Sequence, residues 1–411
     1  MERAREPLQR KISRYYYDYI KRCDVRLTLR FVKMTAIGST SSFQKKGRPK
    51  APSIPGTRTS IHNAQLLVST GIPSLDYLLG GGLPVGSVLL LEQDTYDVYS
   101  KLFLKYFLAE GVVNKHLLTV ASLDINPTSI TENLPAPTDT TPLSDVSESS
   151  SDKEMTIAWR YQNKKSPMSS LDYSRFGHDY DLTKVISNEI ISAVDIELWD
   201  ASCIQVTNPG SFGKEFWSLL KFIQKRIEVS HLSTQSSTPK TNVMRLGLHS
   251  LGSPLWGSEF GKSEKEHRWQ NLTGFFYLLR ALVRNSFSVC MISVPSHLFV
   301  DPALIFRIRA MCDYAVRLES FQGSDKETNP VFKDYHGLFH IEKLATINSL
   351  VPTILDSTDW VFKLKRRKLT IERLHLPPEL SETVNRSQED PVGKTSSPAC
   401  MGGALPRNLD F

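Results

Sequence analysis

The stretch at residues 69–94 begins as a phosphate-binding loop begins and then lacks the residues that hold phosphate. Such a loop follows a buried strand, and its glycines let backbone N–H groups surround the phosphates while a lysine reaches the terminal oxygens. Here the apolar run 87–91 is followed by residues 92–101, which contain no glycine and carry the carboxylates of Glu92, Asp94 and Asp97. A carboxylate ~4 Å from a phosphate costs on the order of 1–4 kcal/mol. The sequence therefore predicts a degenerate phosphate loop.

Three residues of this loop could still face a nucleotide, namely Gln93, Ser100 and Lys101. The missing glycines favour a surface position for Lys101 at the start of the following helix. We therefore expect no cofactor, no metal and no catalytic residue in this chain. An active ATPase with a rearranged site around Ser100 and Lys101 stays open as an alternative. Nucleotide binding that Lys101→Ala weakens would favour it.

The charge of the chain is unevenly distributed. Lys and Arg number 50 against 43 Asp and Glu, and residues 1–60 hold 15 of the former against 4 of the latter. Nucleic-acid contact by the rest of the chain must therefore come from local clusters. Five cysteines without a CxxC pair favour a reducing compartment and argue against a structural zinc site. No apolar run approaches ~20 residues, so we expect no membrane span.

Composition divides the chain into an arm, one domain and a tail. Residues 1–64 are rich in basic and Pro/Gly/Ser residues and are predicted to be a disordered basic arm. Residues 65–380 are predicted to form one domain, with a disordered insertion near 126–153 and a loop near 232–241. After 380 the apolar periodicity ends, which predicts a disordered tail over 381–411.

Strand-like and helix-like patterns alternate through the domain. Short apolar runs of strand length occur at 87–91, 117–121, 243–248, 288–294 and 314–318. Between them, apolar residues at helical spacing form stripes that begin at Phe216, Leu272 and Leu304. This alternation predicts an α/β fold, a mainly parallel sheet with helices on both faces. The runs 338–341, 361–364 and 369–376 predict antiparallel edge strands, with a bulge or a strand end in the last.

The glycine-rich turn before the first strand resembles a known superfamily. TGIPSLD, Gly80–Gly82 and GSVLLLE together resemble the first strand of RecA-superfamily ATPases of the KaiC/RadA type, which implies a RecA-like fold. In active members a later strand ends with an acidic residue, and His249 stands at that place here. Neutral His lacks the anionic oxygen that Mg²⁺ prefers. Spacing identifies no carboxylate partner for His249.

Several further motifs narrow the resemblance. IAWRYQ at 157–162, SRFGHDYDLT at 174–183, LGSPLWG at 251–257 and the stretches 318–344 and 364–380 together resemble the family of fourth subunits of the Elongator complex. The resemblance covers about residues 65–380. It implies a non-catalytic subunit of a heterohexameric ring, built with two copies each of Elongator subunits five and six.

The same resemblance implies what the ring does. Such a ring binds tRNA and docks on the catalytic Elongator core, which carries out carboxymethyl-type modification at carbon 5 of the wobble uridine. It also implies a cytoplasmic protein with a nuclear pool. A transcription-linked adaptor without RNA contact stays open as a further alternative.

Two basic groups are candidates for RNA contact. Lys262, Lys265 and Arg268 lie near Trp269 in the segment after the strand that ends before His249, and Lys365, Arg366 and Arg367 lie in a hairpin turn. Basic residues beside an aromatic suit phosphate contact with base stacking. Glutamates interleave the first group, so an ordinary solvated loop stays open as the alternative interpretation of it.

Aromatic residues in the motifs have two open interpretations. They are either exposed anchors for neighbouring subunits or parts of the domain's own core. The residues concerned are Trp159, Tyr161, Phe176, Tyr180 and Trp256.

Overall fold

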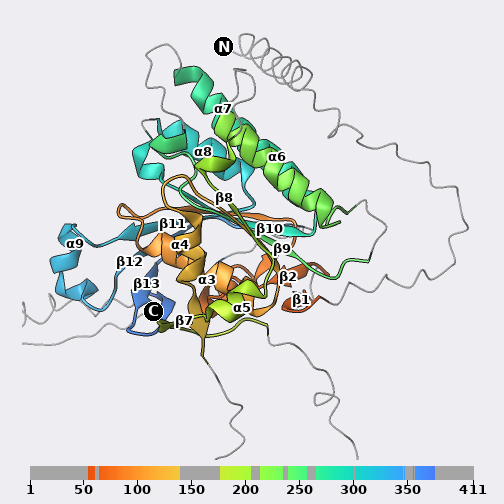
Figure 1. Cartoon of the computed structure of the whole chain (residues 1–411). Coiled ribbons are helices and arrows are strands. Elements are labelled where there is room, and N and C mark those ends of the chain that lie inside the picture. Colours follow the sequence, from red (N-terminus) through yellow and green to blue (C-terminus); the bar gives the residue numbers. More distant parts are fainter. Residues whose placement is uncertain are drawn as a thin grey trace, which may run out of the picture. The chain divides into compact units, whose positions relative to one another are not determined.

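The computed structural model describes residues 54–60, 64–138, 176–204, 213–234, 239–256, 265–299, 301–345, 347, 355 and 357–374, with the backbone alone at 265–270 and 331. All of them lie in the unit Ala51–Phe411. A nine-stranded sheet runs through it in the order β14-β13-β12-β11-β4-β10-β9-β5-β8 (Figure 1).

The sheet is parallel over six strands and antiparallel over its last three. The parallel strands are β4 (Val88–Glu92), β5 (Leu117–Ala121), β8 (Ile196–Trp199), β9 (Met244–Leu248), β10 (Ser288–Val294) and β11 (Tyr314–Ser320). The antiparallel strands are β12 (Gly337–Lys343), β13 (Trp360–Leu364) and β14 (Leu369–Arg373). The predicted α/β class, a mainly parallel sheet with antiparallel C-terminal edge strands, is confirmed.

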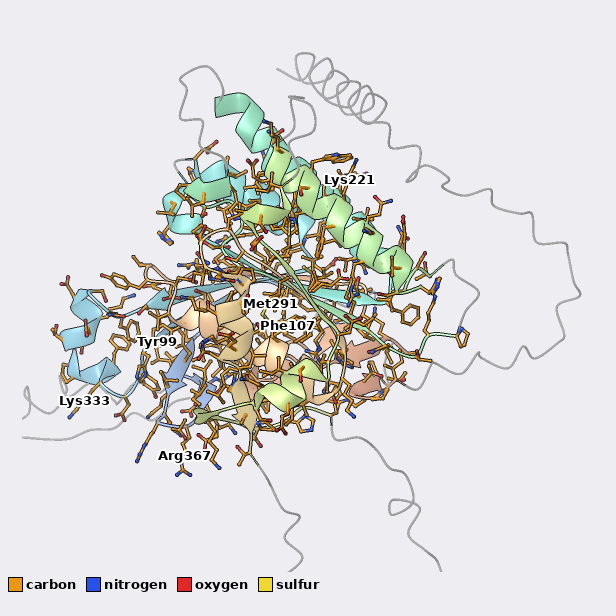
Figure 2. The ribbon with its side chains drawn as sticks, in the orientation of Figure 1. Tyr99, Phe107, Lys221, Met291, Lys333 and Arg367 are labelled. Carbon is orange, nitrogen blue, oxygen red and sulfur yellow. The ribbon has the colours of Figure 1, made fainter. Side chains whose placement is uncertain are left out.

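Helices cover both faces of the sheet. Figure 1 shows α6 (Lys214–Val229), α7 (Lys265–Arg284) and α8 (Pro302–Met311) above it, and α3 (Tyr99–Val113), α4 (Pro127–Glu132) and α5 (Asn188–Ser192) below it. Side chains of a strand alternate between faces, so β4 sends Leu89 and Leu91 toward α3 and Leu90 toward α7. Figure 2 shows Phe107 and Met291 between α3 and the sheet. The domain therefore has one apolar core on each face of the sheet.

Short elements complete the domain. A small sheet joins β1 (Thr57–Thr59), β2 (Leu66–Val68) and β3 (Leu83–Pro84), and α2 (Pro73–Leu78) connects the last two of these strands. A second pairs β6 (Pro135–Pro137) with β7 (Tyr180–Val185), and α9 (Asp325–Thr328) lies between β11 and β12.

Two predicted boundaries are wrong. Residues 57–59, assigned to the disordered arm, form β1, because Arg58 donates a hydrogen bond to Gly81 O at 3.0 Å and lies over the Phe176 ring. The predicted insertion begins too early, because α4 and β6 occupy residues 127–137, with Ile130 buried against the core. The remainder of that insertion, residues 235–238 of the predicted loop and the predicted tail lie outside the described residues.

The C-terminal hairpin and the motif aromatics resolve further alternatives. The β13–β14 register runs without a shift to Arg373, so the change of apolar parity marks a strand end rather than a bulge. Tyr180 and Trp256 are each 2% exposed, and therefore belong to the domain interior instead of forming exposed anchors. Phe176 is half-buried, and Trp159 and Tyr161 lie outside the described residues.

Candidate functional site

The loop between β4 and α3 is closed by its own carboxylate. Asp94 accepts hydrogen bonds from Val98 N at 3.0 Å, Ser100 N at 2.9 Å and Ser100 Oγ at 2.8 Å. Free N–H groups at a helix N-terminus attract anions, which is how phosphate loops hold phosphate. Here the anion is the buried Asp94 side chain. The chain's own carboxylate therefore caps the first turn of α3.

A second carboxylate of the loop contacts His249, the residue that directly follows β9. Asp97 Oδ2 lies 2.7 Å from His249 Nε2, and His249 Nδ1 lies 3.1 Å from Ser122 Oγ. Burial would raise the pKa of Asp97, but the hydrogen bond and charge of His249 outweigh it and lower that pKa. Lys101 Nζ lies 3.8 Å from the same oxygen. The partner of His249, which spacing could not identify, thus comes from the loop itself.

The remaining loop residues are also bound within the protein. Glu92 pairs with Arg309 through contacts of 2.5 and 2.9 Å, and Gln93 Nε2 donates to Ser293 Oγ at 3.0 Å. Of the three candidates, Ser100 and Lys101 share the partner Asp97, whereas Gln93 is bound separately to β10, and each of the three contacts protein atoms. This arrangement fastens the loop to β9, β10 and α8.

Replacing Asp94 tests the closed loop. Asp94→Ala is expected to lower the free energy of unfolding by about 1–2 kcal/mol, because the first-turn N–H groups of α3 lose their acceptor. Urea unfolding of the full chain measures this, with the exposed neighbour Thr95→Ala as the matched control. Equal stability of the two variants would contradict a capping role for Asp94.

The first basic group reaches the sheet edge through α7. Lys265 and Arg268 lie at the beginning of α7, and Lys262 lies outside the described residues. Because α7 follows β9, it begins at the edge where the parallel strands end.

The second basic group forms the tight turn of the β13–β14 hairpin. Lys365 N donates to Lys368 O at 2.8 Å, and Lys368 N donates back at 3.2 Å. Arg367 is 73% exposed and lies 3.9 Å from Asp181, while Lys365 lies 3.7 Å from Glu372. Figure 2 shows Arg367 pointing away from the ribbon. These long, exposed contacts leave the cations available to solvent.

Topology places both basic groups on one edge of the sheet. β12 is antiparallel to both β11 and β13, so β13 runs in the direction of β4 and ends at the same edge. Five strand spacings separate β9 from β13 in the sheet order. At ~4.8 Å a strand, this is about 24 Å along the sheet.

A buried polar cluster around Arg245 was missed in the sequence. Arg245, fully buried on β9, donates to His116 Nδ1 at 3.0 Å, Ser69 O at 2.8 Å and Phe107 O at 3.1 Å. Burial and the charge of Arg245 lower the pKa of His116 to about 3. An arginine within an apolar strand pattern was the only available signal. Arg245 thus ties β9 to α3 and to the segment before α2.

Glu110 on α3 is the anionic centre of the same cluster. It accepts hydrogen bonds from Tyr180 OH at 2.7 Å, Asn114 Nδ2 at 2.8 Å and His178 N at 3.1 Å. Burial opposes its ionisation, but the hydrogen bond from His178 and the charge of Arg245 outweigh burial and lower its pKa to about 2. Nearby, burial raises the pKa of Asp76 to about 6. His178 and Tyr180 of the motif at 174–183 therefore bind the segment around the start of β7 to α3.

Within the described parts of the chain, no group of three His, Cys, Asp or Glu residues is placed to hold a metal ion. Among the described helices, none has the length and apolar character needed to cross a membrane.

The chain is similar to one family of known proteins over most of its length. The PAXNEB protein family matches residues 50–411. Elongator complex protein 4 of Xenopus laevis is 45% identical, with 92% of this chain and 97% of that protein covered. The Homo sapiens protein of the same name is 43% identical, with 91% and 94% covered. A solved KaiC-like protein from Pyrococcus horikoshii has a TM-score of 0.40 and 14% identity, covering 74% of this chain and 98% of that one.

Proposed function

Because the chain belongs to the PAXNEB family of Elongator complex protein 4 chains, we propose that it is a non-catalytic, tRNA-binding subunit of the Elongator complex. With subunits five and six it forms a heterohexameric RecA-like ring. The ring docks on the catalytic core and presents tRNA for carboxymethyl-type modification at carbon 5 of the wobble uridine. The protein works in the cytoplasm, with a nuclear pool.

The closed loop carries the non-catalytic part of this proposal. Asp94 caps α3 where a phosphate would bind, and His249 binds Asp97 where active relatives place a magnesium ligand. A nucleotide would have to displace both carboxylates and their hydrogen bonds. Turnover of ATP by the isolated chain would contradict this part of the proposal.

Exposed apolar side chains support assembly at the same sheet edge. Tyr96, Leu255 and Leu298 are 54%, 62% and 50% exposed, and they follow β4, β9 and β10 respectively. These strands are parallel, and β10 lies between the other two, so the side chains lie at one edge. Exposed apolar patches of this kind are typical of protein–protein interfaces. A neighbouring ring subunit would cover them.

The basic groups support tRNA contact. Lys265 and Arg268 at the start of α7 and the turn at 365–368 share the edge where the parallel strands end. The ends of β9 and β13 are about 24 Å apart along that edge, a distance that one folded RNA can span, because its phosphates follow one another at a few ångströms along the strand. Each group would then bind a different part of the same tRNA.

Charge reversal in the reconstituted ring tests tRNA binding. We expect the triple variant Lys365→Glu/Arg366→Glu/Arg367→Glu to bind tRNA at least about tenfold more weakly at 100 mM salt. Its affinity should also depend less steeply on salt, because a variant with fewer phosphate contacts releases fewer counterions on binding. The reversal Lys262→Glu/Lys265→Glu/Arg268→Glu is expected to do the same. Fluorescence anisotropy over a salt series measures both effects.

The control reverses exposed cations that the proposal does not use. Lys221→Glu/Lys225→Glu changes two exposed positions on α6 and is expected to leave the affinity within about twofold. Native mass measurement checks that every ring remains assembled. Intact rings whose affinity and salt slope are unchanged by both triple reversals would contradict the RNA contacts and favour the adaptor alternative.

A further inference from the structure

The outer surface of α7 and α8 combines exposed aromatic and arginine side chains. Tyr277, Arg280 and Arg284 follow one another at helical spacings of three and four residues, so they lie on one face of α7. Tyr277 is 53% exposed, and the side chains of Arg280 and Arg284 are 40% and 37% exposed. On α8, Phe306 is 62% exposed and Arg307 is also exposed. We call these five residues the α7–α8 surface.

The two helices present these side chains on one continuous surface. α7 packs against α8, and Figure 1 shows both helices on the same side of the sheet. Arg280 and Arg284 donate to Oδ1 of Asp313, two residues beyond the end of α8, at 2.8 and 2.6 Å. The face of α7 that carries Tyr277 is therefore turned toward α8.

The α7–α8 surface has an excess of positive charge. Residues 277–285 and 302–311 contain four arginines and no aspartate or glutamate. Of these, Arg309 is bound by two carboxylates on its other side. Among the described residues, the ion pairs of the other three arginines are those with Asp313, which is 2% exposed. Three guanidinium groups therefore share one buried carboxylate, and a partner would meet the guanidinium groups first.

This combination of side chains suits a protein partner that carries an acidic segment. Aromatic residues and arginine are enriched in the buried centres of protein–protein interfaces. Asp313 holds two of the guanidinium groups in place, so less side-chain entropy is lost when a carboxylate binds them. Arg284 lies about 28 Å along α7 from Lys265, at 1.5 Å a residue. The surface therefore extends away from the basic groups that are proposed to bind tRNA.

A ring subunit needs two interaction surfaces, because it contacts its two neighbours through different parts of itself. Tyr96, Leu255 and Leu298, which follow strand ends at the sheet edge, account for one neighbour. The α7–α8 surface lies instead on the helices that cover one face of the sheet. On the basis of the ring proposed above, we propose that the α7–α8 surface binds an acidic segment of the second neighbour.

Native mass spectrometry of the chain assembled with subunits five and six tests this contact. In a ring of alternating subunits, loss of one of this chain's two contacts opens the hexamer into linear heterotrimers with one copy of each subunit. The variant Tyr277→Ala/Phe306→Ala/Arg307→Glu is expected to form these heterotrimers at protein concentrations at least about tenfold above those at which the unmodified ring opens. Arg280 and Arg284 stay unchanged in this variant because they balance the buried Asp313.

The sheet-edge contact provides a second arm of the experiment. Leu255→Asp is expected to give the same heterotrimers, because it removes the other neighbour. The triple variant and Leu255→Asp combined should release this chain as a monomer. Release of the monomer by the triple variant alone would overturn the proposal, because the α7–α8 surface would then not be a separate contact.

Matched controls test the position and the charge of the contact. Lys225→Glu/Val229→Ala reverses one exposed cation and removes one exposed apolar side chain on the neighbouring α6, and it should leave the hexamer intact. Arg307→Lys keeps the positive charge and should assemble as the unmodified chain does, whereas Arg307→Glu should open the ring at a concentration at least about threefold higher. Thermal unfolding of each isolated variant checks that the domain is folded.

Several outcomes would overturn the proposal. A triple variant that forms hexamers as stable as the unmodified ring would exclude a contact at the α7–α8 surface. Equal assembly of Arg307→Lys and Arg307→Glu would exclude an acidic partner segment. An intact hexamer of the triple variant with weakened tRNA binding would assign the surface to RNA instead. Failure of the unmodified chain to assemble with subunits five and six would contradict the proposed function itself, and this contact with it.

Discussion

Arg245→Ala is expected to lower the free energy of unfolding by about 3–5 kcal/mol. The substitution leaves the buried carboxylate of Glu110 without the nearby guanidinium charge and removes the donor to His116 Nδ1, Ser69 O and Phe107 O. Burial of an uncompensated charge costs more than the lost packing alone. Urea unfolding followed by tryptophan fluorescence measures the difference.

Three further variants separate charge from packing in this cluster. Arg245→Met keeps an unbranched side chain without the charge, and it is expected to be destabilised nearly as much. Tyr180→Phe removes one hydrogen bond to Glu110 and should cost about 1 kcal/mol. The exposed Lys225→Ala should stay within about 0.5 kcal/mol of the unmodified chain. An Arg245→Met variant as stable as the unmodified chain would contradict the electrostatic role of Arg245.

Trp256→Ala is expected to have a comparable effect, about 3–5 kcal/mol. The Trp256 ring stacks between Trp199 and Phe216, with both ring centroids at 5.4 Å. Its loss leaves a cavity between α6 and the end of β8 that these rings cannot fill without repacking. Thermal unfolding of the full chain would report the change as a lower melting temperature.

The neighbouring residue provides the matched control for Trp256. Leu255 is 62% exposed, so Leu255→Ala should change the stability of the isolated chain by less than about 0.5 kcal/mol. The proposed ring predicts instead that Leu255→Asp weakens assembly with subunits five and six. If Trp256→Ala unfolds like Leu255→Ala, the stacked core between β8 and α6 does not contribute as described.

The sequence predicted the local elements well because each depends on nearby residues. The apolar runs at 117–121 and 288–294 are β5 and β10 at the same bounds, and the run at 87–91 is β4 displaced by one residue. Errors occurred where distant residues decide. β1 is ordered by Arg58 reaching Gly81 and Phe176, a contact that the composition of a Pro- and Gly-rich segment does not reveal.

The candidate site likewise has features that the sequence alone reveals and contacts that only the structure reveals. The absence of glycine from 92–101 and the histidine at position 249 were readable from the sequence, and they predicted a degenerate loop. That His249 binds Asp97 was not readable, because 152 residues separate them. The same holds for the cluster of Arg245 and Glu110, which joins elements from across the chain.

What the sequence determined by itself is the position of eight of the nine strands of the large sheet, the lack of glycine in residues 92–101 and the family resemblance, because these follow from periodicity and from residue types at short spacing. Only the tertiary structure decided that the loop is capped by Asp94 and bound by His249, and that Tyr180 and Trp256 face inward. The physical reason is that a sheet brings together side chains from strands far apart in the chain, and their hydrogen bonds and burial depend on that meeting rather than on either segment alone.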